Sequence, residues 1–140
     1  NWLSDVTGEN IMLPTEQQGQ YTAQADSGRI YPWGNYWDSS KCRNSVDKGY
    51  GSANNTSPVT KYASSYNSPF GVVDMAGNTW EWCLTDYQTG QQDIEGEGIR
   101  IIRGGSWYSD NKDDFRSDCR LRHNPQFRYE EFGFRLARLK

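Results

Sequence analysis

The pattern of apolar and polar positions predicts short strands separated by long polar loops. Across residues 79–84, every second residue is large and apolar, which is the period of a strand with one face buried. Three further segments, residues 70–75, 100–107 and 132–139, combine apolar and β-branched or aromatic residues and are also expected to be strands.

One helix is expected early in the chain. Thr15 precedes Glu16 and is followed three residues later by Gln18, the arrangement of a capping box in which each side chain bonds the backbone of the other. This predicts a helix over residues 16–23, weakened by Gly19. With the short strands, it gives an α+β, loop-rich fold.

Composition supports a single ordered domain spanning residues 1–140. Only 34% of the residues are hydrophobic, but 14% are aromatic, including six Trp and nine Tyr, and large rings bury much area per residue. The loop of residues 26–68 is therefore expected to be ordered around its aromatic turn, Tyr31-Pro32-Trp33-Gly34-Asn35.

Net charge and hydropathy argue against nucleic-acid binding and against a membrane-spanning segment. The net charge of −3 argues against bulk electrostatic binding to nucleic acid. No apolar run approaches the ~20 residues of a transmembrane segment. Because the chain begins at Asn1 without methionine, we expect a domain truncated at its N-terminus. This leaves the compartment open, with an extracytoplasmic or cell-surface location slightly favoured.

Three cysteines, Cys42, Cys83 and Cys119, cannot all be paired within the chain. With a single histidine, His123, they do not indicate a zinc site. The spacing permits a Cys42–Cys83 disulfide, and three buried thiols are the alternative that we favour.

Several motifs, taken together, resemble the formylglycine-generating-enzyme (sulfatase-modifying-factor) family, whose fold is C-type-lectin-like. They run in the family order over nearly the whole chain, and the two most specific are Asp74-Met75-Ala76-Gly77-Asn78-Thr79-Trp80-Glu81-Trp82 and Arg103-Gly104-Gly105-Ser106-Trp107. The others are Leu13-Pro14-Thr15-Glu16, Tyr31-Pro32-Trp33-Gly34-Asn35, Ser57-Pro58-Val59 and Gly133-Phe134-Arg135.

The first of these motifs indicates a calcium site. Asp74 and Glu81 bracket a tight turn, so carboxylates and backbone carbonyls can surround one hard cation. The resemblance implies four ligands: the Asp74 and Glu81 side chains and the carbonyls of Gly77 and Thr79. Alternatively, Glu81 is a buried carboxylate satisfied by an arginine or by backbone N–H groups. Some relatives carry a second site, for which Asn44 and the Ser45 carbonyl are candidates, although residues 48–55 do not align with it.

The resemblance also bears on catalysis. Catalytic members use two cysteines after the second motif to bind copper and oxidise a substrate cysteine to formylglycine, and soft thiolates suit Cu(I). The matching positions are Ser109 and Asp114, so copper is not expected. Iron is not expected either, because the resemblance implies that iron-dependent relatives take His ligands from a separate helical domain, which is not found in these 140 residues. Cys119 matches a structural cysteine whose disulfide partner position is Ala23.

Residues 108–132 lie where the resemblance places the ligand face of the fold. Aromatic and charged side chains of this kind dominate binding hot spots. Phe115 and Phe127 are the candidates for which packing inside the loop is the main alternative. The full set of ligand-binding candidates is Tyr108, Asp110, Asn111, Asp114, Phe115, His123, Gln126, Phe127, Tyr129 and Glu130.

The sequence thus predicts a non-catalytic, calcium-stabilised domain that binds a protein, peptide or glycan. In variable proteins of diversity-generating retroelements, this segment of the fold is hypermutated, which is a more specific version of the same reading. The alternative is a formylglycine-generating or related peptide-modifying oxidoreductase, motivated by the family resemblance.

Overall fold

A computed structural model describes residues 2–46, 55–63, 68–92, 94 and 98–139. Two helices, α1 (Trp2–Thr7) and α2 (Glu16–Gln24), accompany six short strands. The strands are β1 (Asn10–Met12), β2 (Trp80–Asp86), β3 (Arg100–Arg103), β4 (Leu121–His123), β5 (Phe132–Gly133) and β6 (Ala137–Leu139). This is the expected mixed α+β architecture with long connecting loops.

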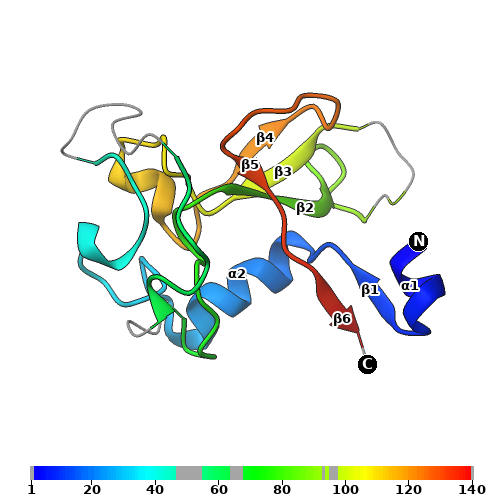
Figure 1. Cartoon of the computed structure of the whole chain (residues 1–140), viewed down its shortest axis with the longest axis horizontal. Coiled ribbons are helices and arrows are strands. Elements are labelled where there is room, and N and C mark those ends of the chain that lie inside the picture. The colour runs from blue at the N-terminus through cyan, green and yellow to red at the C-terminus, as the bar shows by residue number, and fades with distance from the viewer. Residues whose placement is uncertain (1, 47–54, 64–67, 93, 95–97, 140) are drawn as a thin grey trace.

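The strands form two sheets. The larger has the order β4-β3-β2-β5, in which only the β2–β5 pair is parallel, and the smaller pairs β1 with β6 in antiparallel fashion. Figure 1 shows the larger sheet on one side of α2, and β1 beside β6 near the two ends of the chain. Chain segments far apart in sequence therefore meet in both sheets.

The helix α2 forms where the capping box predicted it. The Thr15 hydroxyl accepts from the Gln18 backbone N–H at 3.1 Å, and the Gln18 side chain accepts from the Thr15 N–H at 2.9 Å. The helix is attached to the large sheet, because the Glu16 N–H donates to the Thr85 hydroxyl and the Pro14 carbonyl accepts from Leu84 N–H.

A buried aromatic cluster forms the core under the loops. Phe115 is 1% exposed, and its ring lies 5.1 Å from that of Trp37. Large rings thus fill the interior that the few aliphatic residues could not fill alone. The cluster consists of Tyr31, Cys42, Val46, Ala76 and Phe115, with Ile30, Trp33 and Trp37 packed against it.

Three of the four strand predictions need correction. Residues 70–75 form no strand, since Gly71 (φ 72°) and Asp74 (φ 54°) have left-handed backbone that interrupts an extended segment. The strand expected over residues 100–107 ends at Arg103, where Gly104 (φ 98°) turns the chain. The strand expected over residues 132–139 is two strands, β5 and β6, in different sheets.

Candidate ligand-binding groove and cation site

The turn that carries Asp74 packs tightly against the chain around Arg43. A Cβ on Gly77 (φ 81°) would lie 2.6 Å from the Arg43 carbonyl oxygen, so this position requires glycine. The next residue, Asn78, donates its N–H to the same carbonyl at 3.0 Å and bonds Ser57 through its side-chain amide. The motif therefore fixes a turn on which other groups are placed.

The Asp74 carboxylate is buried. The residue is 7% exposed, and neither carboxylate oxygen contacts a donor among the described residues. Burial raises the pKa of Asp74 to about 6, opposed by the charge of Arg135 and increased by that of Glu81. An unpaired buried carboxylate is costly, so a cation at this place would lower its free energy.

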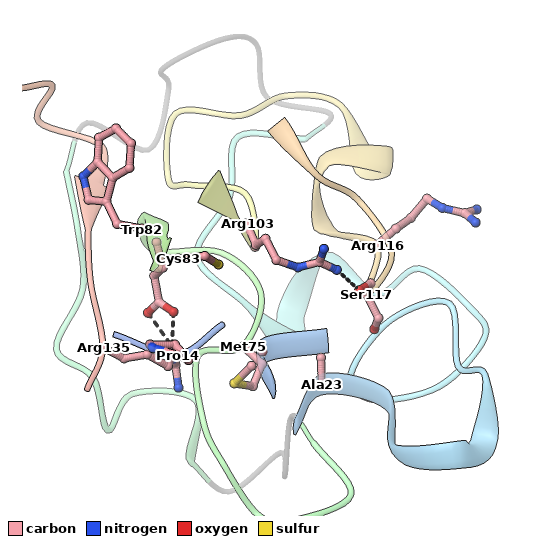
Figure 2. A pocket seen from close by; sticks show the side chains of 12 residues that line it. Pro14, Ala23, Met75, Trp82, Cys83, Arg103, Arg116, Ser117 and Arg135 are labelled. Carbon is pink, nitrogen blue, oxygen red and sulfur yellow. Dashed lines mark hydrogen bonds and ion pairs between the residues drawn. The ribbon is translucent and has the colours of Figure 1, made fainter. Parts of the chain in front are cut away.

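Glu81, on β2, is paired with Arg135. The guanidinium donates to both carboxylate oxygens, with Nη2 2.9 Å from Oε1, and also donates to the Asp74 carbonyl at 2.7 Å. Arg135 lies at the edge of a small pocket of about 30 Å³ that Pro14, Met75 and Cys83 also line (Figure 2). The arginine alternative for Glu81 therefore holds in this structure.

The residues around Asp74 fit a hard cation in part. Neither Asp74 oxygen has a donor among the described residues, and the Gly77 carbonyl accepts the Thr79 N–H at 3.0 Å, which leaves it a second lone pair. Glu81 would have to share its carboxylate with Arg135. Among the described residues, no three carboxylate, imidazole or thiol side chains form a metal-sized cluster, so a calcium ion here would rely on backbone carbonyls.

The side chains of the two residues suggested for a second cation site are hydrogen-bonded within the fold. The Asn44 amide donates to the carbonyls of Ser39 and Cys42, and its oxygen accepts the Val46 N–H at 3.0 Å. The Ser45 hydroxyl donates to the Trp107 carbonyl at 2.8 Å. These bonds account for the burial of both side chains, while residues 48–54 of the suggested loop lie outside the described residues.

Ser109 and Asp114, which stand at the positions of the catalytic cysteines, lie together. Ser109 is 5% exposed, and its hydroxyl is 3.4 Å from that of Ser106. Burial raises the pKa of Asp114, and a hydrogen bond with the Ser109 side chain opposes that rise. The arrangement offers hydroxyl and carboxyl oxygens, which are hard donors, where Cu(I) would want thiolates.

None of the three cysteines forms a disulfide among the described residues. Cys83 is buried, which raises the pKa of its thiol to about 12, and burial also raises the pKa of Cys119 to about 11. Such thiols remain protonated at neutral pH and are poor nucleophiles. Ala23, the position of the implied disulfide partner, is itself buried.

An open groove of about 500 Å³ joins the two ends of the segment of residues 108–132. Tyr108, packed edge-on against Trp107 at 5.1 Å, faces residues of the segment just before β5. Three sequence candidates meet here, namely Tyr108, Tyr129 and Glu130. Sequence reasoning missed three further lining residues, Trp107, Arg128 and Glu131, although each is next to a candidate in the chain.

A cluster of rings around His123 shares Tyr129 with this groove. The His123 ring lies 5.1–5.3 Å from those of Phe127, Tyr129 and Phe132, and its Nδ1 is buried without a partner among the described residues. Phe127 and Tyr129 remain 53% and 46% exposed. His123 thus supports the exposed rings from within.

The other candidates fall in different places. Phe115 lies in the core, so its prediction as a ligand-binding residue is corrected to the packing role. Asp110 and Asn111 are exposed, and the Asn111 side chain accepts from Asp113 N–H to begin a short 3₁₀ turn. Gln126 is exposed in the turn after β4. None of these four lines the groove.

Comparisons with known proteins place this architecture in a family. The model of the Sulfatase-modifying factor enzyme 1-like domain matches residues 1–140. The chain belongs to this family. It is 29% identical to the protein named inactive C-alpha-formylglycine-generating enzyme 2 of Bos taurus, over 89% of this chain and 43% of that protein. It therefore spans less than half the length of that relative.

Solved structures show the same fold. PvdO from Pseudomonas aeruginosa aligns with a TM-score of 0.76 and 28% identity, over 98% of this chain and 56% of that one. Treponema denticola variable protein 1 aligns with a TM-score of 0.68 and 25% identity, over 91% of this chain and 47% of that one. The formylglycine-generating-enzyme-like, C-type-lectin-like fold expected from the motifs is confirmed.

Within the described residues, the longest helix has nine residues, and none has the length and apolar character needed to cross a membrane.

Proposed function

We propose that this chain is a binding domain for a protein or peptide, and that the groove between residues 107–108 and 128–131 holds the ligand. The observation that carries the proposal is the convergence there of Trp, Tyr and Arg side chains from separate segments around one concavity. These residue types dominate protein interfaces because they offer large contact areas and directional donors.

The geometry of the groove is set by the surrounding fold, which lowers the cost of binding. The Trp107 N–H donates to the Asn78 carbonyl at 2.9 Å, and the Trp80 N–H donates to the Glu131 carbonyl at 2.8 Å. Both walls are thereby attached to the turn between Asp74 and Glu81. A site whose backbone is already ordered loses less entropy when a ligand binds.

We further infer that a calcium ion at Asp74 stabilises this base. The inference is supported by the Gly77 carbonyl and by the buried Asp74 carboxylate, which has no hydrogen-bond partner among the described residues. The ion would be held by Asp74, the carbonyls of Gly77 and Thr79, and Glu81 shared with Arg135. It would act on stability and leave ligand contact to the groove.

Selection of peptide ligands tests the groove. A phage-displayed library of random 12-residue peptides would be selected on the wild-type chain, and the enriched peptides would be tested against Tyr108→Ala/Tyr129→Ala. We expect at least tenfold weaker binding, whereas Tyr21→Ala, which removes a half-exposed tyrosine from α2, leaves binding unchanged. Failure to enrich any peptide, or equal binding to the double variant, would refute the proposal.

The likeness to a variable protein favours a more specific version, in which residues 108–132 are diversified by a retroelement. Tyr108, Asp110 and Tyr129 are side chains that such diversification often produces. Sequencing this gene in related isolates, with its neighbourhood, provides the test. Substitutions spread evenly over the chain, with no adjacent reverse transcriptase gene, would refute this version.

The oxidoreductase alternative is weaker because Ser109 and Asp114 supply no thiolate. The oxidoreductase alternative is tested by measuring oxygen uptake by the copper-loaded chain in the presence of a cysteine-containing peptide. Uptake that is lost in Ser109→Ala would revive catalysis, and uptake no greater than that of copper and peptide without the chain would end it.

A further inference from the structure

A second concavity, of about 540 Å³, lies on the loop of residues 33–39 and shares no residue with the proposed groove. It is an open hollow on the surface rather than an enclosed cavity. Three aromatic residues, Trp33, Tyr36 and Trp37, line it together with three polar ones, Asn35, Asp38 and Ser39.

This loop is held in one shape from within. Tyr31 and Gly34 exchange two backbone hydrogen bonds, at 2.8 and 3.0 Å, and the Trp33 indole N–H donates to the Tyr36 carbonyl at 3.0 Å. Beneath it, the rings of Tyr31 and Trp33 stack 5.5 Å apart, with an interplanar angle of 6°. A ligand would therefore meet a pocket that needs little ordering.

The polar side chains of the pocket keep hydrogen-bonding capacity that no other described residue uses. Asn35 accepts the Ile30 N–H through Oδ1, which leaves its NH₂ group as a donor. Asp38 accepts from Ser40 through Oδ1, which leaves Oδ2 as an acceptor. Those bonds from Ser40 lower the pKa of Asp38, so its carboxylate is ionised at neutral pH.

The aromatic residues add an unused donor and an exposed ring. The Trp37 indole N–H is buried and has no acceptor among the described residues. Tyr36 is 87% exposed, and none of the ring contacts that join Tyr31, Trp33 and Trp37 reaches it. The Trp37 donor is covered, whereas the Tyr36 ring is open to a ligand.

We propose that residues 33–39 form a carbohydrate site that takes one neutral pyranose unit. The C–H bonds on the flat face of a pyranose carry partial positive charge and are attracted to the negative face of an aromatic ring. Its hydroxyl groups need donors and acceptors side by side, which Asn35 and Asp38 supply. The charge of Asp38 selects against acidic sugars. The inference does not depend on the proposed function, because the two sites share no residue.

Ligand-observed NMR tests this site with four probes, the methyl glycosides of glucose, galactose, mannose and N-acetylglucosamine. We expect saturation transfer to at least one glycoside, with a Kd in the millimolar range. Binding should weaken at least tenfold in Asn35→Ala/Tyr36→Ala. Both side chains are exposed, so circular dichroism and the melting temperature of the variant should confirm that it folds.

The matched control is Phe127→Ala, which removes an exposed ring beside the proposed peptide groove and should leave glycoside binding unchanged. Absence of transfer to all four glycosides, or transfer that persists in Asn35→Ala/Tyr36→Ala, would overturn the carbohydrate site. Peptides selected on the groove should still bind this double variant, so failure of one proposal is distinguishable from failure of the other.

Discussion

Replacement of Glu16 is expected to be the most destabilising single change at the start of α2. Its carboxylate accepts from Arg103 at 2.8 Å and from Arg120 at 2.7 and 3.0 Å. The Glu16 and Arg103 side chains are only 12% and 10% exposed, whereas that of Arg120 is 42% exposed. Glu16 thus joins α2 to β3 through Arg103 and to the segment before β4 through Arg120.

The magnitude follows from these exposures. Glu16→Ala leaves the buried charge of Arg103 without its carboxylate partner, which typically costs about 3–5 kcal/mol. The retained hydrogen bond from Arg103 to the Ser117 carbonyl places the expected loss toward the lower end of that range. Arg120→Ala removes a half-exposed partner and should cost no more than about 1 kcal/mol.

Urea unfolding followed by tryptophan fluorescence measures both changes. With a denaturant dependence of about 2 kcal/mol/M, Glu16→Ala should lower the unfolding midpoint by roughly 1.5–2 M, and Arg120→Ala by at most about 0.5 M. Glu16→Gln, which keeps one acceptor oxygen, should fall between them. If the Glu16→Ala and Arg120→Ala midpoints were equal, the argument from the buried Arg103 charge would be wrong.

Two further predictions concern the turn at Asp74 and the glycine beneath the core. Chelation of calcium by EGTA at pH 7.5 should lower the wild-type melting temperature by roughly 5–10 °C, the effect of losing an ion present at ~100 times its Kd, and should not affect Asp74→Asn. In EGTA, the pKa of Asp74 in the folded state is about 6, above its ordinary value of 3.8. The stability that this group contributes is therefore full below pH 3.8 and is lost as the pH rises through 6. A flat profile of stability against pH, or one matching that of Asp74→Asn, would contradict this. Gly105→Ala should lower the free energy of unfolding by about 3 kcal/mol, because the new Cβ would lie 2.7 Å from the Phe115 ring at a positive φ. The control is Gly90→Ala, with φ 69° and open space around it, which should cost about 1 kcal/mol. Equal losses of stability in chemical denaturation would remove the steric argument.

Local signals in the sequence predicted structure well where the interaction is itself local. The capping box of α2 joins residues three apart, and its pattern was sufficient to place the helix start. The apolar alternation over residues 79–84 likewise located β2, although the strand continues to Asp86. Apolar content misled the strand prediction over residues 70–75, because the backbone at Asp74 is left-handed and a side-chain pattern does not report φ.

Contacts between residues far apart in the chain determine the features that the sequence did not predict. Whether Glu81 faces a cation or an arginine depends on Arg135, which lies 54 residues further along the chain. The division of residues 132–139 between two sheets has the same origin, because β5 pairs with β2 and β6 pairs with β1. Phe115 was placed on the ligand face for a related reason, since the residue type alone does not distinguish a core ring from a binding ring.

The pairing of β1 with β6 has a consequence for biosynthesis. Ala137 is the register partner of Met12 but follows it by 125 residues, so the ribosome releases the second strand of this sheet long after the first. Throughout that interval the edge of β1 that pairs with β6 is open, and an open strand edge can recruit other chains. Termination before residue 137 would leave this edge of β1 without β6, and such a chain should self-associate more readily than one that includes β6.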